Sequence, residues 1–244
     1  MVDLGLAESR SKAQALILEG KVRVAGQVET KASRALTEDV AVEVETPPRF
    51  VSRGGEKLEG AFAAFCEGEC IEPLVAEGKT CIDVGSSTGG FTDCLLQHGA
   101  AFVMAVDVGT NQLAYRLRTD PRVWVKENYN ARYMTAADLP RIPQLAVTDV
   151  SFISLRLILP PICSVLDPGG TIVALIKPQF EVGKGKAPGG LVRDAALRLE
   201  ARDGIVRFAQ NELGLNLLGL RESPIRGREM GNIEYLSYWQ KPTA

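Results

Sequence analysis

The sequence predicts an α/β protein whose main part is a doubly wound, mostly parallel sheet of seven strands, preceded by a small α+β module. Three observations lead to this fold class. From about residue 57 onward, apolar strand candidates alternate with helical segments, which is typical of a parallel sheet covered on both faces. A glycine-rich turn follows the first of these strands. The residues before Pro47-Pro48 instead show the pattern of one short helix followed by short strands.

The small module is expected to span residues 1–46. Ser9 is a suitable N-cap, and Gly20 is a suitable stop, for a first helix. Alternating apolar residues then indicate short strands on either side of a turn. The helix and strands are expected at residues 9–19, 22–28 and 40–44. Because consecutive prolines stiffen a connection, residues 47–56 are interpreted as a linker and 57–244 as the second domain.

The second domain carries seven strand candidates, most of them separated by helical segments. They are Thr80–Val84, Phe102–Val106, Val123–Lys126, Leu145–Thr148, Thr171–Ile176, Leu215–Leu220 and Ile233–Trp239. The last two lie close together in the sequence, without room for a long crossover. The sheet is therefore expected to end in an antiparallel pair.

Composition narrows the class of protein. A formal net charge of −2 excludes a globally basic chain, so that contact with nucleic acid would need a local patch. The five cysteines lack paired C-x-x-C spacing, which argues against a disulfide framework and a zinc site, and no metal is expected. The sequence shows neither a signal peptide nor a long apolar run, and a cytoplasmic location without membrane contact is expected.

The glycine-rich turn predicts a cofactor site. It is no P-loop, because no Gly-Lys-Ser/Thr follows, and its glycines lack the G-x-G-x-x-G spacing of dinucleotide enzymes. Asp107 ends the second strand, where an acid can bind the ribose of either NAD or S-adenosylmethionine. Asp83 favours S-adenosylmethionine, since an acid before the glycines suits a free amino group better than a pyrophosphate. The predicted cofactor-binding residues are Asp83, Gly85, Ser86, Ser87, Thr88, Gly89, Gly90, Phe91, Asp107, Val108, Asn130 and Asp149.

A second group of charged residues predicts the reaction centre. Asp149 and Lys177 end the fourth and fifth strands, whose carboxyl ends line the ligand crevice of an open parallel sheet. Methylation of an alcohol needs removal of the hydroxyl proton, and a lysine can act as the base if burial or a second cation lowers its pKa. Lys57 is the candidate for that cation, and Glu234 could orient one of the ammonium groups.

These motifs resemble a known family over nearly the whole chain. Residues 9–13 with 22–26 look like an S4 RNA-binding domain. The other motifs resemble the TlyA-type rRNA methyltransferases, some members of which are also called haemolysin A: Val51–Lys57, Asp83–Phe91, Thr148–Phe152, Ile176–Glu181 and Gly231–Tyr235.

The resemblance implies an FtsJ-like, Rossmann-like methyltransferase domain that uses S-adenosylmethionine. Its implied reaction is methylation of ribose 2′-hydroxyls, typically of cytidine, in ribosomal RNA or ribosomal subunits. It also implies that Lys57, Asp149, Lys177 and Glu234 form a Lys-Asp-Lys-Glu catalytic tetrad. The S4 module is expected to be short at its N-terminus, since residues 1–6 look like the end of the family's first helix.

RNA contacts are expected from basic residues of both domains. The candidates are Arg10, Lys12, Lys21, Arg23, Arg53, Lys184, Lys186, Arg226 and Arg228. The glycines and lysines of residues 181–190 suggest a mobile lid over the target nucleotide. His98 is interpreted as a residue of a helix end rather than of catalysis.

Three alternative functions remain beside the methyltransferase hypothesis. An NAD-dependent oxidoreductase would need a different glycine spacing. A haemolysin-like membrane activity would need membrane-inserting segments, which the sequence does not show. An RNA-binding ribosome assembly factor with weak or no catalytic activity would not need all four residues of the tetrad.

Overall fold

The computed structural model describes residues 1–37, 40–45, 48–66, 72–183, 185–227 and 230–243. The chain divides into two compact units, Met1–Arg49 and Phe50–Ala244, each of which is described by itself. Pro47, at the predicted connection, lies outside the described residues. Phe50 is buried in the core of the larger unit, so that this unit begins within the segment 47–56 that the sequence suggested as a linker.

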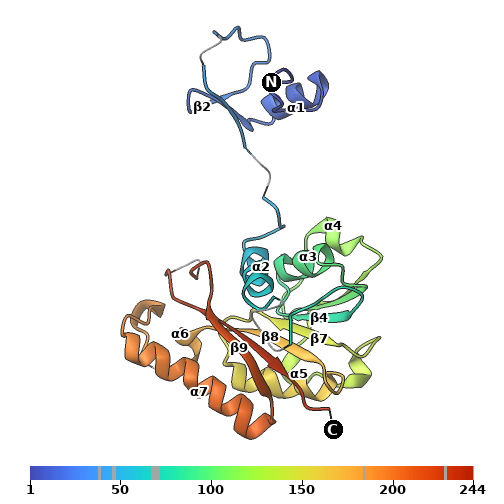
Figure 1. Cartoon of the computed structure of the whole chain (residues 1–244), viewed down its shortest axis with the longest axis vertical. Helices are drawn as coiled ribbons and strands as arrows, with labels where there is room; N and C mark the ends of the chain where they lie inside the picture. Colours follow the sequence, from blue (N-terminus) through green and yellow to red (C-terminus); the bar gives the residue numbers. More distant parts are fainter. Residues whose placement is uncertain (38–39, 46–47, 67–71, 184, 228–229, 244) are drawn as a thin grey trace. The chain divides into compact units, whose positions relative to one another are not determined.

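The smaller unit packs one helix against a three-stranded antiparallel sheet (Figure 1). Its elements are α1 (Arg10–Leu18), β1 (Val22–Val24), β2 (Gln27–Glu29) and β3 (Val42–Val44), with strand order β2-β1-β3. The Ser9 side chain accepts a hydrogen bond from the Lys12 N–H, which confirms Ser9 as the N-cap. Only Ala13, Val22 and Val24 are buried apolar residues in the described part of this unit, which makes its core small.

The larger unit contains the predicted seven-stranded sheet. Its strands are β4 (Thr80–Val84), β5 (Phe102–Val106), β6 (Val123–Lys126), β7 (Leu145–Thr148), β8 (Thr171–Ile176), β9 (Asn216–Glu222) and β10 (Tyr235–Gln240). The order is β6-β5-β4-β7-β8-β10-β9. Strands β4 to β8 are parallel, whereas β10 runs antiparallel to both β8 and β9. This confirms the fold class and the antiparallel end of the sheet.

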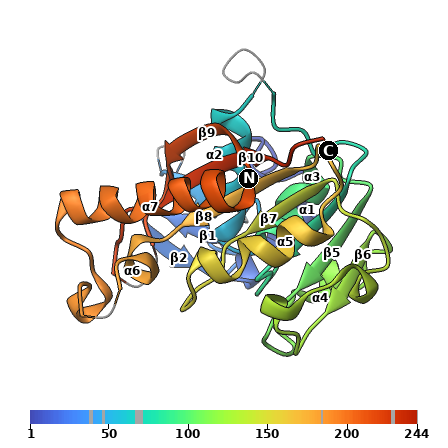
Figure 2. The same ribbon diagram turned by 90° about the horizontal axis from the view of Figure 1, so that it is seen from below.

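Helices cover both faces of this sheet (Figures 1 and 2). On one face, α2 (Gly54–Ala64), α3 (Gly90–Gln97) and α4 (Tyr115–Arg118) form one apolar core with inward side chains of the strands. On the other face, α5 (Leu159–Val165) and α7 (Ala195–Leu213) form a second core. The short α6 (Pro178–Glu181) follows β8. Four 3₁₀ turns complete the described elements: η1 (Ala131–Tyr133), η2 (Ala136–Asp138), η3 (Leu155–Leu157) and η4 (Pro188–Gly190).

Alternation along the strands explains why one sheet supports two cores. In β4, Cys81 packs into the core that contains α2 and α3, while its neighbour Ile82 packs into the core that contains α5 and α7. Both faces are therefore apolar, and the strands are almost continuously buried. Within the described residues, no helix has both the length and the hydropathy needed to cross a bilayer.

Phe65, directly after α2, packs against the antiparallel end of the sheet. Its ring is fully buried and stacks on Tyr238 with 5.3 Å between the centroids. We expect Phe65→Ala to lower the free energy of unfolding by about 3–5 kcal/mol, because the large cavity cannot collapse fully. Chemical denaturation measures the change. Ile142→Ala is the control, since Ile142 is 63% exposed and its truncation should change stability little.

Candidate active site

A cleft of about 900 Å³ opens at the carboxyl ends of the central strands. The glycine turn after β4 lines one part of it, together with the start of α2. The ends of β7 and β8 and the segment before β10 line the rest. Residues that lie far apart in the sequence, such as Lys57, Asp149 and Glu234, meet there. The sheet order explains the convergence, because β4, β7, β8 and β10 are consecutive neighbours.

The glycine turn has a conformation that larger residues would disturb. Gly89 has φ +98°, and a Cβ there would lie 2.4 Å from Leu117. A Cβ on Gly90 would lie 2.7 Å from the backbone nitrogen of Gly55, so that α2 and α3 can approach only because this residue is glycine. The turn therefore places the N-terminus of α3, with its backbone N–H groups, beside the cleft.

Asp107 shapes the turn from the neighbouring strand. One carboxylate oxygen accepts a hydrogen bond from the Ser87 N–H at 2.7 Å, and the other accepts one from the Gly109 N–H at 2.7 Å. The carboxylate is thus fixed at the end of β5, in the position expected of a group that binds a ribose.

Asp83 is a fully buried acid directly beneath the turn. Its Oδ2 accepts hydrogen bonds from the Thr92 N–H and hydroxyl, at 2.9 and 2.7 Å. Its Oδ1 has no hydrogen-bond partner among the described residues. Burial raises the pKa of Asp83 to about 7. A buried carboxylate oxygen without a partner is costly, and a cationic ligand group in the turn would compensate it.

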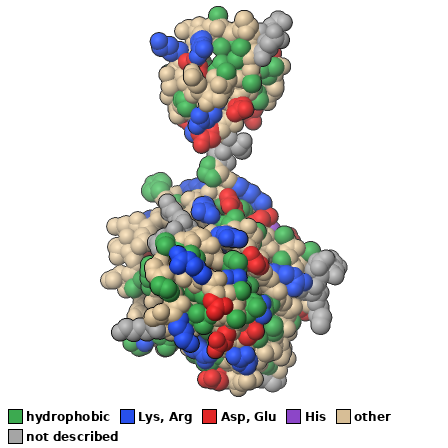
Figure 3. Space-filling view, turned by 90° about the vertical axis from the view of Figure 1, so that its left-hand side faces the viewer, with side chains coloured by type: hydrophobic (Ala, Val, Ile, Leu, Met, Phe, Trp, Pro, Cys, Tyr) green, Lys and Arg blue, Asp and Glu red, His purple; other side chains and the backbone are tan. Residues whose placement is uncertain are grey.

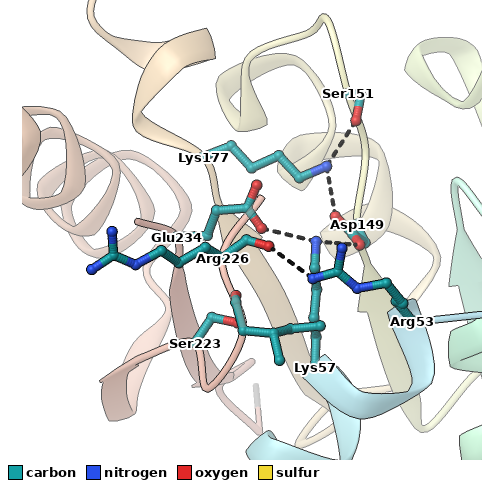
Figure 4. Close-up of polar contacts among 9 residues, drawn as sticks. Arg53, Lys57, Asp149, Ser151, Lys177, Ser223, Arg226 and Glu234 are labelled. Carbon is teal, nitrogen blue, oxygen red and sulfur yellow. Dashed lines mark hydrogen bonds and ion pairs between the residues drawn. The ribbon is translucent and has the colours of Figure 1, made fainter. Parts of the chain in front are cut away.

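Four charged side chains form a connected network in the cleft (Figure 4). Lys57 Nζ lies 3.1 Å from Asp149 Oδ2 and 2.8 Å from Glu234 Oε2. Lys177 Nζ lies 2.6 Å from Asp149 Oδ1 and donates a hydrogen bond to Ser151 Oγ at 2.8 Å. The contact of Lys177 with Asp149 is a close ion pair rather than an aligned hydrogen bond. Asp149 therefore bridges the two lysines.

The two lysines of the network have different charged partners. Burial favours the neutral form of Lys57, but the carboxylates of Asp149 and Glu234 together outweigh burial and raise the pKa of Lys57 above its ordinary value. Lys57 is thus a fixed cation. Lys177 pairs with a single carboxylate, and its other partner is a neutral hydroxyl. Lys177 is therefore held by fewer carboxylates than Lys57.

The cleft residues that were not predicted from the sequence include Phe152, Gln179 and Phe180. Phe152 has φ +63° and is 82% exposed, and its ring lies 5.3 Å from that of Phe180. Gln179 Oε1 is buried without a hydrogen-bond partner among the described residues. All three line the cleft beyond Lys177. Their position within the motifs around Asp149 and Lys177 was the only available signal, because exposure and backbone strain are tertiary properties.

The structure brings most of the predicted cofactor residues together. Gly85, Ser86, Ser87, Thr88, Gly90, Phe91 and Asp149 line the cleft. Gly89 packs against α4 and Asp107 supports the turn. Val108 is 71% exposed. Asn130 does not line the cleft, and its side chain caps η1 by accepting a hydrogen bond from the Arg132 N–H.

The predicted RNA-binding residues are more widely spread. Arg53 and Arg226 line the cleft, and the Arg53 guanidinium donates to the Arg226 carbonyl at 3.5 Å. Lys184 and Arg228 lie outside the described residues. In the smaller unit, Arg10, Lys12 and Arg23 are exposed, whereas Lys21 pairs with Glu19. Lys186 lies beside a small cavity between α6 and α7. Lys and Arg side chains are scattered over the face shown in Figure 3 and are interspersed with acids.

The segment suggested as a lid is anchored at both ends. The buried Asn232 accepts a hydrogen bond from the Val192 N–H at 3.0 Å and donates one to the Gly190 carbonyl at 2.7 Å. At the other end, Glu181 accepts hydrogen bonds from the Ser154 hydroxyl and the Leu155 N–H. Gly183 and Gly185, between these anchors, both have positive φ.

The fold and the cleft together define a class of enzyme. A Rossmann-like sheet of this strand order, with a glycine turn, an acid at the end of β5 and a Lys-Asp-Lys-Glu network, is the arrangement of a methyltransferase. Residues 50–241 match the FtsJ-like methyltransferase family and residues 1–42 match the S4 domain. The chain belongs to the FtsJ-like methyltransferase family, and its smaller unit is an S4 domain.

Several known proteins are similar over most of their length. The 16S/23S rRNA (cytidine-2′-O)-methyltransferase TlyA of Mycobacterium tuberculosis (strain ATCC 25618 / H37Rv) is 44% identical over 100% of this chain and 88% of its own. Hemolysin A of Brachyspira hyodysenteriae is 43% identical over 96% of this chain and 95% of its own. A solved structure from Streptococcus thermophilus, described as a candidate hemolysin, has a TM-score of 0.76 at 41% identity and covers 98% of this chain and 85% of its own.

The network makes a direct prediction about Lys57. Glu234→Gln removes one of the two carboxylates that stabilise its ammonium group, so that the pKa of Lys57 should fall. Nuclear magnetic resonance titration of ¹³C-labelled lysines measures this change. Glu222→Gln, at an exposed position of β9, is the matched control and should leave it unchanged. If the pKa of Lys57 were unchanged in the Glu234→Gln variant, Glu234 would not be a group that keeps Lys57 charged.

Proposed function

We propose that this protein transfers the methyl group of S-adenosylmethionine to a ribose 2′-hydroxyl of ribosomal RNA, at a cytidine. The observation that carries the proposal is the network of Lys57, Asp149, Lys177 and Glu234 beside the glycine turn. The similarity to an enzyme named as an rRNA (cytidine-2′-O)-methyltransferase supports the choice of substrate. A ribosomal substrate would place the protein in the cytoplasm.

The residues at the glycine turn fit S-adenosylmethionine. The unpartnered, buried Oδ1 of Asp83 suits a ligand with a cationic amino group, and Asp107 suits its ribose. The N-terminus of α3 suits its carboxylate. When bound, this cofactor supplies an electrophilic methyl group on a sulfonium.

The chain's own residues would position the hydroxyl and remove its proton. Lys177, in its neutral form, accepts the 2′-hydroxyl proton at Nζ. Asp149 and Ser151 hold Nζ in place from two sides. Lys57 remains charged between Asp149 and Glu234 and holds the Asp149 carboxylate in place beside Lys177. Fixed orientation within the cleft supplies a large part of the rate enhancement.

The rim of the cleft is suited to a nucleotide. Phe152 offers an exposed aromatic ring beside the half-buried Phe180, on which a base removed from its stack could lie. The unpartnered Gln179 Oε1 can accept a hydrogen bond from a ligand N–H or hydroxyl. Arg53 and Arg226 can meet the phosphates, while Arg10 and Lys12 would contribute RNA affinity from the S4 domain. The complete tetrad disfavours a purely non-catalytic assembly factor.

Lys177→Ala should abolish methyl transfer, because no other side chain can replace its Nζ between Asp149 and Ser151. The assay is transfer of radiolabelled methyl groups to ribosomal subunits that lack native modification. Label at a position resistant to alkaline cleavage identifies the 2′-oxygen as the acceptor. Cofactor binding, measured by calorimetry, should persist in the variant.

Lys79→Ala is the control for this experiment. Lys79 directly precedes β4, at the opposite end of the strand from the cleft, so that its loss should leave transfer intact. If Lys177→Ala retained the parent rate, Lys177 would not be the base. If the parent bound the cofactor but methylated neither subunit, the proposed substrate would be wrong.

Cofactor affinity should increase with pH through the titration of Asp83. Because burial raises its pKa to about 7, Asp83 is mostly protonated at pH 5.5 and half ionised at pH 7. Only the ionised form attracts a cationic amino group, so that affinity should rise about tenfold over this interval. Calorimetry at both pH values measures the change. The Asp83→Asn variant should bind the cofactor weakly, with an affinity that does not change with pH. If the affinity of the variant rose with pH as steeply as that of the parent, Asp83 would not be the group responsible.

A further inference from the structure

Three side chains with metal-binding atoms gather between α2 and α3, apart from the cleft. Glu59 comes from α2, Cys94 comes from α3, and His98 is the C-cap residue of α3. Cys94 and His98 are four apart in the sequence, which places them on the same side at the end of this helix. The ligand atoms of all three residues lie within 4.8 Å of one another. None of the three lines the cleft.

The contacts between these side chains are short and well defined. His98 Nε2 lies 2.8 Å from Glu59 Oε2, and Cys94 Sγ lies 3.8 Å from the same oxygen. The His98 ring stacks on Phe62 with 3.8 Å between centroids and 9° between the planes, which fixes its orientation. The imidazole nitrogen therefore faces the carboxylate and the sulfur as part of the packed structure.

These separations are close to those of a tetrahedral zinc site. Bond lengths of about 2.0–2.3 Å from zinc to nitrogen, oxygen and sulfur imply about 3.3–3.7 Å between neighbouring ligand atoms. The observed distances from Glu59 Oε2 are 2.8 Å to His98 Nε2 and 3.8 Å to Cys94 Sγ, just below and just above this range. All three atoms lie within 4.8 Å of one another, so that side-chain adjustment alone could bring them to ligand distances.

Burial also suits a metal site with one open position. Cys94 is fully buried, whereas 28% of the His98 side chain and 31% of the Glu59 side chain are exposed. An ion could reach the cluster from solvent and bind the sulfur inside. Cysteine, histidine and a carboxylate are ligands that zinc accepts, and three protein ligands with one water complete four-coordination.

We propose that Glu59, Cys94 and His98 bind one Zn²⁺ ion, with water as the fourth ligand. Binding forms zinc bonds to sulfur, nitrogen and oxygen. It releases the thiol proton of Cys94 to solvent, while the neutral imidazole of His98 binds through Nε2 and keeps its proton on Nδ1. The ion replaces a hydrogen-bonded contact by a covalent link between the two helices. The proposal departs from the sequence expectation that the chain holds no metal.

The position of the cluster gives the ion a structural role. Helix α2 also carries Lys57 of the catalytic network, and α3 begins at Gly90 of the glycine turn. A zinc ion between these helices would hold the fixed cation against the cofactor turn without contacting the reacting atoms. Its main measurable effect is expected on stability rather than on the chemical step.

Titration of the full-length chain with Co²⁺ tests the proposal directly. Cobalt replaces zinc in such sites and gives a near-ultraviolet sulfur-to-cobalt absorption band only when a thiolate is a ligand. We expect the band to saturate at one equivalent of Co²⁺ and to disappear when Zn²⁺ is added. Zinc at about 100 times its Kd should raise the Tm by roughly 5–10 °C.

Variants distinguish zinc bound at this site from metal bound elsewhere on the protein. Cys94→Ala and His98→Ala should each lose the cobalt band and the zinc-dependent rise in Tm. Glu59→Gln, which keeps the size of the side chain, should weaken zinc binding at least tenfold. Cys163→Ser is the matched control, because Cys163 lies in α5 in the other core and should retain both signals.

Absence of a cobalt band in the folded parent protein would overturn the proposal. So would a band or a zinc-dependent rise in Tm that survives Cys94→Ala. Circular dichroism of each variant confirms that it is folded, and a variant that does not fold is replaced by Glu59→Gln as the deciding case. Methyl transfer is not the readout, so that failure of this proposal leaves the proposed enzymatic function untouched.

Discussion

The ammonium of Lys57, held between two carboxylates, is the contact on which the arrangement of the cleft depends. A buried charge is tolerated only when it is paired, and removal of one partner typically costs about 3–5 kcal/mol. Asp149 follows β7 and Glu234 precedes β10, while Lys57 belongs to a helix that lies on one face of the sheet. The pairing therefore fixes α2 relative to the strand ends. It also leaves Asp149 with one oxygen for Lys177.

Most of the fold followed from the sequence, because hydrophobic burial on two faces leaves an unmistakable pattern. All seven strands of the larger unit lie at the predicted positions to within about two residues, and the antiparallel end was anticipated from a short connection. The start of the larger unit was harder to place. Phe50 and Val51 are an isolated apolar pair in an otherwise polar, glycine-rich segment, and only the burial of Phe50 in the core assigns it to this unit.

The charged residues of the cleft could be predicted because carboxyl ends of parallel strands meet at one edge. Asp149 and Lys177 needed only that rule. Lys57 and Glu234, which are 177 positions apart, were candidates by charge alone, and only the family resemblance implied that all four residues form one tetrad. Their roles remain predictions. Ser151, Phe152 and Gln179 had no sequence signal of their own: a hydrogen bond, a positive φ and an unpartnered amide oxygen arise only from the packed chain. The cluster at His98 escaped notice because Glu59 comes from another helix.

The strand order has a consequence for the sequence of events during synthesis. β10 lies between β8 and β9, and β9 pairs with no other strand among the described residues. When β9 leaves the ribosome, the strand with which it pairs in the folded protein has therefore not yet been made. Glu234 directly precedes β10, so that its carboxylate can take its place beside Lys57 only once β10 has been made and has paired with β8.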